Sequence, residues 1–547
     1  MANSDDGTNV DFLVWAQFAL GDNLLAYVLC CSLDSLNSLM SGETELSQRQ
    51  SEVVQAISSI KASLPDGLDR EGIRQGLRFW VTQVDGEVGA IAKKLREHVG
   101  GAGETVAVCD ELEASIAELA FDAYPAFLLP PDENDLSFLA EKTNFRVSSV
   151  IFQHPQSSIF AEAAMEDKVF KKVFTEHNEH TGYVAFVLRN TGSGGGLQLS
   201  MIADLVLRAA WRQEQNDSVA PHRFVEEALT QLRLVRGALA GKPQVVLCRI
   251  GLAGVLLPTG RQLELDGARV RSVTDAEREV APASLKGALA TTDETGATVD
   301  INYDGDLVFE YSYPYKVRIR KDEESDLVSW PDDMLPPESL DSAIMKLRFS
   351  LLMAVERDYR ALLIPTWRTF DEPLNVGYSM SWSDPRQSSN LHPVQLSEDE
   401  MRAWAEWYGR LNGDHFKRVE LALSRTLRAA AERRDPSDVL IDAVIAWENL
   451  FGTKDGEPTF RITMCLARLL KSSPTERLEL KAELGKIYTL RSKVVHGSAA
   501  LKPADHPRCQ RALEVAIEAI RVLATERVDI LALPTGADRS AALLLEG

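Results

Sequence analysis

The sequence predicts a multidomain α+β protein with an N-terminal helical region, a central mixed α+β domain with an antiparallel sheet, and a C-terminal all-α helical bundle. Its 547 residues are enough for about three to five domains of ordinary size. Apolar residues recur at three- and four-residue intervals toward both ends of the chain, whereas segments in the middle alternate apolar and polar residues. Hydrophobic residues at 45% and charged residues at 26% match ordinary globular proteins and exclude wholesale disorder.

The charge balance is strongly acidic, since 59 Lys and Arg against 81 Asp and Glu give a net charge of -22. This balance excludes a basic, nonspecific nucleic-acid coat but is compatible with a local phosphate site. The opening MANSDDGTNV is acidic where a secretory signal is basic, and polar residues interrupt the apolar stretch after it. The six scattered cysteines have neither zinc-ligand nor disulfide-framework spacing. We therefore expect a cytoplasmic protein with no membrane span, no metal and no other cofactor.

The first region, residues 1–122, is expected to be a layer of antiparallel helices. Apolar residues between Phe12 and Ile60 recur mostly at helical intervals. Pro130 and Pro131 then prevent a helix from continuing, because proline lacks the N–H donor and restricts the residue before it. A domain boundary is expected there.

The central domain, residues 140–400, contains the clearest strand signal. In the segment 298–319, apolar side chains alternate on both sides of Asp304-Gly305. An Asp-Gly pair readily adopts the positive φ angles of a type I′ turn, so this segment predicts a β-hairpin. Further elements are expected in the same domain: strands within 242–258 and 261–273, and a helix within 339–359.

Two other features of the central domain have competing interpretations. The glycine cluster at 192–196 lies between an apolar run and a helical pattern, where freed backbone N–H groups can hold an anion. The P-loop Lys-Ser/Thr and the dinucleotide-binding spacing are absent, which favours a flexible connector. His177 and His180 have helical spacing without a zinc-protease signature, and we interpret them as a solvated helix end.

The C-terminal domain, residues 401–547 with a core at about 435–530, has well-marked helix ends. Asp435 precedes a proline and can cap the helix that follows. Ser473 and Glu476 form a capping box at the start of a long helix, and Gly497 supplies the left-handed residue that ends it. Four helices of an up-and-down bundle are therefore expected, over residues 436–451, 459–470, 474–496 and 506–527.

Three strings in this domain carry a family resemblance. YTLRSKVVHG at 488–497, preceded by IAWENLF at 445–451 and RITMCLARLL at 461–470, resembles the HEPN superfamily, specifically its Apea-like branch. The resemblance covers about the last quarter of the chain. It implies a helical bundle that pairs with a second copy about a twofold axis and, in ribonuclease members, carries an arginine and a histidine at fixed spacing. Arg491 and His496 match these positions, so the resemblance implies that they are the catalytic pair.

The chemistry of RNA cleavage also fits this pair without a metal. Histidine moves protons near neutral pH, and arginine is a permanent cation that stabilises charge developing on a phosphate. Residues five apart on a helix lie about 140° apart in projection, so Arg491 and His496 need an unwound helix end or a cleft shared by two protomers. The other residues expected at the site are Glu448, Tyr488, Ser492 and Lys493 in supporting roles and Lys486 as a phosphate ligand.

Together these inferences predict a metal-independent RNA endonuclease whose N-terminal regions sense or regulate. The resemblance further implies a toxin or a role in bacterial defence against phage by abortive infection. The expected partners are RNA, with tRNA as one candidate, a second copy of the chain bound through the C-terminal bundle, and a phage-derived trigger.

Other interpretations stay open. An HEPN bundle can bind nucleotide or RNA and dimerise without cutting, and Ser492 favours this because catalytic members often have Asn, Asp or His there. Arg491 can instead be a partner of a buried Glu448, and His496 can bond the last carbonyls of its helix. Trp447 is interpreted as a core residue rather than a base-stacking platform. A separate enzyme in the central domain is disfavoured, because no set of nucleophile, base and orienting residue appears there.

Overall fold

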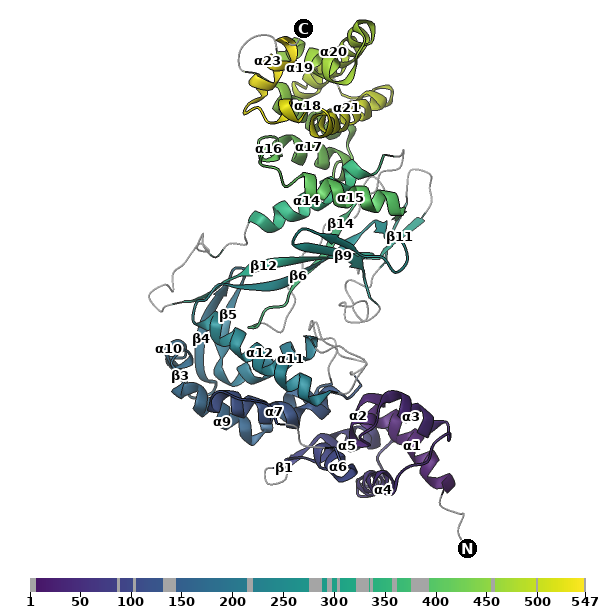
Figure 1. Cartoon of the computed structure of the whole chain (residues 1–547), viewed down its shortest axis with the longest axis vertical. Helices are drawn as coiled ribbons and strands as arrows, with labels where there is room; N and C mark the ends of the chain where they lie inside the picture. The colour runs from purple at the N-terminus through teal and green to yellow at the C-terminus, as the bar shows by residue number, and fades with distance from the viewer. Residues whose placement is uncertain are drawn as a thin grey trace. The chain divides into compact units, whose positions relative to one another are not determined.

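The computed structural model of the chain (Figure 1) contains helices and antiparallel strands in two compact units, as expected for a multidomain α+β protein. The first unit comprises Met1–Val246, Pro314–Pro336 and Phe370–Ser379, and the second comprises Leu247–Tyr313, Pro337–Thr369 and Met380–Gly547. The domain boundaries near residues 122, 140 and 400 stay predictions. The structure describes residues 6–85, 89–101, 105–130, 144–213, 220–274, 288–292, 298–302, 305–320, 334, 338–356, 362–374, 393–453, 458–497 and 500–545. No helix in these ranges has the length and apolar character needed to cross a membrane.

The first unit is mainly helical. The side chains of Ser47 and Asp69 accept hydrogen bonds from the first backbone N–H groups of two helices, which fixes where those helices start. Its helices are α1 (Asp6–Leu20), α2 (Asp22–Val28), α3 (Leu33–Met40), α4 (Gln48–Ala62), α5 (Arg70–Thr82), α6 (Ile91–Val99), α7 (Glu111–Phe127), α8 (Arg146–Gln153), α9 (Pro155–Glu166), α10 (Phe170–Val173), α11 (Ile202–Gln213) and α12 (Pro221–Leu239). A short pair, β1 (Val84–Asp85) and β2 (Gly89–Ala90), interrupts them.

Aromatic side chains join α7, α11 and α12 in this unit. The ring centroid of Phe224 lies 5.1 Å from that of Phe127 and 5.2 Å from that of Tyr124, and Trp211 contacts all three rings. Tilted and edge-on ring pairs at these distances add to the burial of their apolar area. The helical region therefore continues past residue 122, and α7 ends only at Phe127.

A four-stranded sheet in the first unit corrects two expectations. It contains β3 (Glu176–Asn178), β4 (Gly182–Arg189), β5 (Ser193–Gln198) and β13 (Val317–Ile319). The glycine cluster is strand β5, paired antiparallel with β4, so the expected flexible connector is wrong. Gly192 makes the turn between them at φ 92°, a conformation that glycine adopts without strain. The expected helix end is also wrong, because His177 lies in β3 with its ring 4.8 Å from that of Tyr183.

The second unit contains a five-stranded sheet in the order β14-β6-β12-β9-β8. The strands expected in the segments 242–258 and 261–273 are confirmed. The sheet strands are β6 (Gln244–Ala253), β8 (Leu263–Leu265), β9 (Ala268–Ser272), β12 (Leu307–Tyr315) and β14 (Ile364–Phe370). A parallel pair, β7 (Val255–Leu256) with β15 (Val394–Gln395), lies outside it.

The expected hairpin around Asp304-Gly305 is wrong. β11 (Thr298–Asn302) pairs with β10 (Ala288–Thr292), whereas β12 lies between β6 and β9. Asp306 binds both neighbours of β12: its N–H donates to the Leu252 carbonyl at 2.8 Å, and its own carbonyl accepts from the Val273 N–H at 3.2 Å. The chain therefore enters the larger sheet after Gly305 instead of folding back on β11.

A charged cluster occupies one face of this sheet. Glu310 on β12 is only 6% exposed and accepts hydrogen bonds from Arg269 at 2.7 Å and from Arg271 at 3.0 Å. Arg249 on β6 lies 3.7 Å from the same carboxylate. Burial by itself raises the pKa of Glu310, but the Arg269 hydrogen bond and the Arg271 charge outweigh it and hold the pKa below its ordinary value. The carboxylate thus offsets the mutual repulsion of three arginines.

This depressed pKa predicts a pH-dependent stability. A carboxyl group with a lower pKa in the folded state stabilises that state above its unfolded pKa, about 4.3, and the contribution disappears as the pH falls through the folded pKa. We expect the difference in thermal stability between wild type and Glu310→Gln to be constant near neutral pH and to shrink below about pH 4.3. Thermal unfolding followed by circular dichroism from pH 7 to pH 3 measures it, and a difference that stays constant throughout would contradict the prediction.

The helices of the second unit include all four that the sequence predicts in the C-terminal domain. They are α14 (Glu338–Ala354), α15 (Glu398–Arg410), α16 (Asp414–Lys417), α17 (Glu420–Ala431), α18 (Pro436–Phe451), α19 (Pro458–Leu470), α20 (Pro474–Val495), α21 (His506–Thr525), α22 (Val528–Leu531) and α23 (Gly536–Leu545). Asp435 accepts from the Ser437 N–H at 2.7 Å, and Ser473 accepts from the Glu476 N–H at 3.2 Å, as the sequence predicts.

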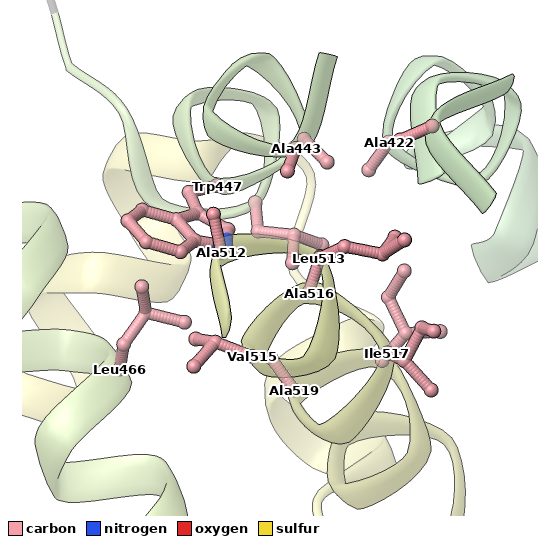
Figure 2. Close-up of a cluster of buried hydrophobic side chains, with 14 of the residues drawn as sticks. Ala422, Ala443, Trp447, Leu466, Ala512, Leu513, Val515, Ala516, Ile517 and Ala519 are labelled. Carbon is pink, nitrogen blue, oxygen red and sulfur yellow. The ribbon is translucent and has the colours of Figure 1, made fainter. Parts of the chain in front are cut away.

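Small side chains let the bundle helices approach closely. Ala443 of α18 lies near Ala422 of α17, and the fully buried Trp447 points from α18 toward Leu466 of α19 and Ala512 of α21 (Figure 2). Alanine permits short distances between helix axes, and the indole fills the remaining space. Trp447 is therefore a core residue, as the sequence predicts.

Candidate active site

The site is built on the C-terminal end of α20. The N–H of His496 donates to the Ser492 carbonyl at 3.1 Å, and Gly497 follows with φ 66°. This left-handed residue ends the helix where the sequence predicts, because glycine adopts the conformation without a steric penalty. His496 is therefore the last residue before the chain leaves the helix, and its side chain is exposed.

Glu448 on α18 joins two of the expected site residues. The Tyr488 hydroxyl donates to Glu448 Oε1 at 2.7 Å, and Arg491 Nη2 donates to Glu448 Oε2 at 3.3 Å. Tyr488 and Arg491 are three residues apart on α20, so they share the helix face that packs toward α18. The side chains of Arg491 and Glu448 are 21% and 30% exposed. The contact between Arg491 and Glu448 that the structural alternative predicts is present, although Glu448 is partly exposed rather than buried.

Glu448, Tyr488 and Arg491 form a hydrogen-bonded group that determines the charge state of Tyr488. Burial, reinforced by the hydrogen bond and charge of Glu448, raises the pKa of Tyr488 to about 12. The tyrosine therefore stays a neutral hydrogen-bond donor near neutral pH and is not a base. Arg491 Nε is screened from solvent and has no hydrogen-bond partner among the described residues, so the guanidinium is only partly used by Glu448.

The imidazole of His496 is exposed at the end of α20. Within the described parts of the chain, its imidazole forms no hydrogen bond and no ion pair. The helix does not unwind before it, since α20 is continuous through Val495. On a regular helix, positions 491 and 496 therefore project from different sides.

The remaining expected residues lie along the outside of α20. Lys486 and Lys493 are exposed, and their spacing of seven residues places them on one face of the helix. His496 follows Lys493 by three positions, so this basic stripe leads to the imidazole. Ser492 is half-buried. Among the described residues, its contact with His496 is the backbone hydrogen bond in which the Ser492 carbonyl accepts the His496 N–H.

One supporting residue escapes sequence reasoning. Arg539 on α23 is 1% exposed and donates to the Leu450 carbonyl at 2.8 Å and to the Asn449 carbonyl at 2.9 Å. It thereby satisfies carbonyls at the end of α18 that lack partners within the helix. This bond holds the turn that carries Glu448. No local signal marks Arg539, because its role depends on how α23 packs.

Comparisons with protein-family models, with curated proteins and with solved structures found no match. The HEPN interpretation therefore stays a prediction.

Proposed function

We propose that the C-terminal bundle is a metal-independent RNA endonuclease of the HEPN type. The observation that supports it is the exposed imidazole of His496, which bonds no described residue, at the end of the helix on which Glu448 contacts Arg491. A proton-transfer group and a fixed cation are the two components that this reaction needs. The basic stripe of Lys486 and Lys493 provides electrostatic attraction for the phosphate backbone.

The proposed reaction uses the 2′-hydroxyl of the RNA as nucleophile. One His496 accepts the 2′ proton as the 2′ oxygen bonds to phosphorus, and the bond to the 5′ oxygen breaks. A second histidine donates a proton to the leaving 5′ oxygen, so the products are a 2′,3′-cyclic phosphate and a 5′-hydroxyl. Arg491 stabilises the additional negative charge on the phosphate oxygens in the transition state. The reaction needs two protomers, because it uses two histidines and each bundle supplies one His496. In each protomer, Arg491 projects from a different side of α20 than His496.

The same proposal assigns the rest of the chain a restraining role in the cytoplasm. A net charge of -22 repels bulk RNA and limits access to a local basic site. Residues before 401 are proposed to sense a phage-derived trigger and to release the nuclease in abortive infection. tRNA is a candidate substrate.

Substitution of Arg491 tests the proposal against a purely structural role. We expect Arg491→Ala to lower RNA cleavage by about 10²- to 10³-fold, as loss of one transition-state donor does. The stability loss should be about 1 kcal/mol or less, because the ion pair with Glu448 is partly exposed. Cleavage of tRNA and total RNA in EDTA measures activity, and thermal unfolding measures stability.

Arg511→Ala is the matched control. Arg511 is a half-buried arginine of the same bundle that lies on α21 and is ion-paired with Glu518 at 2.8 Å, with Glu514 at 3.5 Å and with Glu483 of α20 at 3.5 Å. Its substitution should leave cleavage within about twofold of wild type, since a partly exposed ion pair contributes little. Equal activity losses in both variants would contradict a catalytic role for Arg491.

A second candidate function is a bundle that binds RNA or nucleotide and dimerises without cutting. The ion pair between Arg491 and Glu448 favours it, because a structural arginine makes the same contact. In that case Arg491→Ala and wild type bind RNA to similar extents and neither cleaves it.

A further inference from the structure

A cavity in the second unit has the composition of a ligand site. Its volume is about 840 Å³, within the range typical of small-molecule sites. Residues of α14, of β14 and of the segment 411–432, which includes α16 and α17, supply most of its walls. The expected active site at the end of α20 contributes no residue to it.

One part of the cavity wall is apolar and aromatic. Phe349, Phe416 and Trp367 are at least nine-tenths buried, and Leu423 and Leu427 of α17 complete this surface. A wall of this kind removes a flat or aliphatic ligand body from water.

Cations outnumber carboxylates along the rest of the wall. The lining contains Lys346, Arg348, Arg368, Lys417 and Arg428 against Asp341, Glu420 and Glu432. This is an excess of two positive charges (five minus three) in a chain whose net charge is -22. Two of the cations are already engaged, since Arg348 bonds Glu432 at 2.7 Å and Lys417 bonds Asp414 at 2.9 Å.

One further cation of the wall remains available for an anion. The side chain of Arg428 is exposed and forms no hydrogen bond or ion pair with any described residue. Lys346, in contrast, donates to the amide oxygen of Asn412, and its ammonium lies 3.6 Å from the centroid of the Tyr408 ring; neither of these partners lines the cavity.

We propose that this cavity binds a small organic anion with an apolar body. The body packs against Phe349, Phe416 and Trp367, and the acidic group pairs with Arg428. A purely apolar ligand would leave Arg428 without a counter-charge, and an inorganic anion would leave the aromatic wall exposed.

Fluorescence titration of the full chain with 1-anilinonaphthalene-8-sulfonate, an apolar aromatic anion, tests the site. We expect Arg428→Glu to weaken binding about tenfold, since an attractive charge pair becomes repulsive. Arg434→Glu is the control, because Arg434 is also exposed, has no bonded partner among the described residues and lies outside the cavity. It should change the affinity by about twofold or less, the range of screened surface charges.

Two further measurements test whether the probe binds in this cavity and whether its charge contributes to the affinity. Ser424→Phe fills the cavity from α17 without changing charge and should abolish the saturable binding. N-phenyl-1-naphthylamine, which lacks the sulfonate, should bind wild type and Arg428→Glu about equally, because charge does not contribute to its affinity. Unchanged sulfonate binding in both Arg428→Glu and Ser424→Phe would overturn the proposal, as would equal weakening by Arg428→Glu and Arg434→Glu.

Binding of the sulfonate in the cavity should also change backbone amide exchange in α17. The Ala422 N–H of this helix donates to Asn449 at 3.2 Å, and Arg425 bonds the buried Asp442 at 2.6 Å, so α17 is fixed to α18 on its other side. We expect the sulfonate to slow amide hydrogen exchange in α17 of wild type and not of Arg428→Glu. Equal protection in both proteins would place the probe elsewhere and contradict the site.

Discussion

His496→Ala is expected to lower the rate of RNA cleavage by about 10²- to 10⁴-fold, the usual contribution of a positioned acid or base. The imidazole is exposed and bonds no described residue, so its removal leaves the packing of the bundle unchanged. The prediction is measured with wild type and variant purified identically and incubated with tRNA and total RNA. Expression of wild type should also slow bacterial growth, and expression of the variant should not.

His180→Ala is the matched control for this experiment. His180 is likewise exposed, lies in the loop between β3 and β4 of the first unit, and forms no side-chain bond to a described residue. Its substitution should leave cleavage unchanged. Full activity of His496→Ala would exclude the histidine from the chemistry, whatever the activity of the wild type.

Trp447→Ala is expected to destabilise the bundle by about 3–5 kcal/mol, the range for truncating a buried tryptophan. Its side chain is fully buried among α18, α19 and α21, so the substitution leaves a large cavity (Figure 2). Trp447→Phe should lose far less, because the indole Nε1 has no hydrogen-bond partner among the described residues and phenylalanine removes an unsatisfied buried donor.

Hydrogen exchange of peptides from α18 and α21 measures this difference locally, since a chain of two units need not unfold in one step. Faster exchange in Trp447→Ala and near-normal exchange in Trp447→Phe are expected. Normal exchange in Trp447→Ala with weakened RNA binding would instead indicate a base-stacking role.

The helices of the bundle could be predicted because their signals are local. Asp435 and Ser473 cap the residues that directly follow them, and Gly497 ends α20 through its own backbone angle. The contact between Glu448 and Arg491 could be anticipated for a related reason: a carboxylate inside an apolar helix needs a donor.

Strand pairing could not be predicted in the same way. The Asp304-Gly305 sequence favours a tight turn, but β12 pairs with β9 and lies beside β6, which begins more than fifty residues earlier. Pairing over such separations depends on the packing of the whole sheet rather than on a dipeptide. The sequence of the glycine cluster likewise predicts a connector, although the cluster pairs with β4 and forms strand β5.

The cavity and the supporting role of Arg539 escaped the sequence for a similar physical reason. The cavity walls come from β14, α14 and α17, which are separated by long stretches of chain. Arg539 reaches the end of α18 only because α23 folds against it. Neither arrangement leaves a motif of fixed spacing.

The ends of the RNA products test the central claim most directly. Wild-type protein in EDTA should produce fragments with 2′,3′-cyclic phosphate and 5′-hydroxyl ends, because the 2′ oxygen is the proposed nucleophile and no metal takes part. His496→Ala should produce none of these fragments. Fragments with 3′-hydroxyl and 5′-phosphate ends, or cleavage that EDTA abolishes, would contradict the assignment of this chemistry to Arg491 and His496.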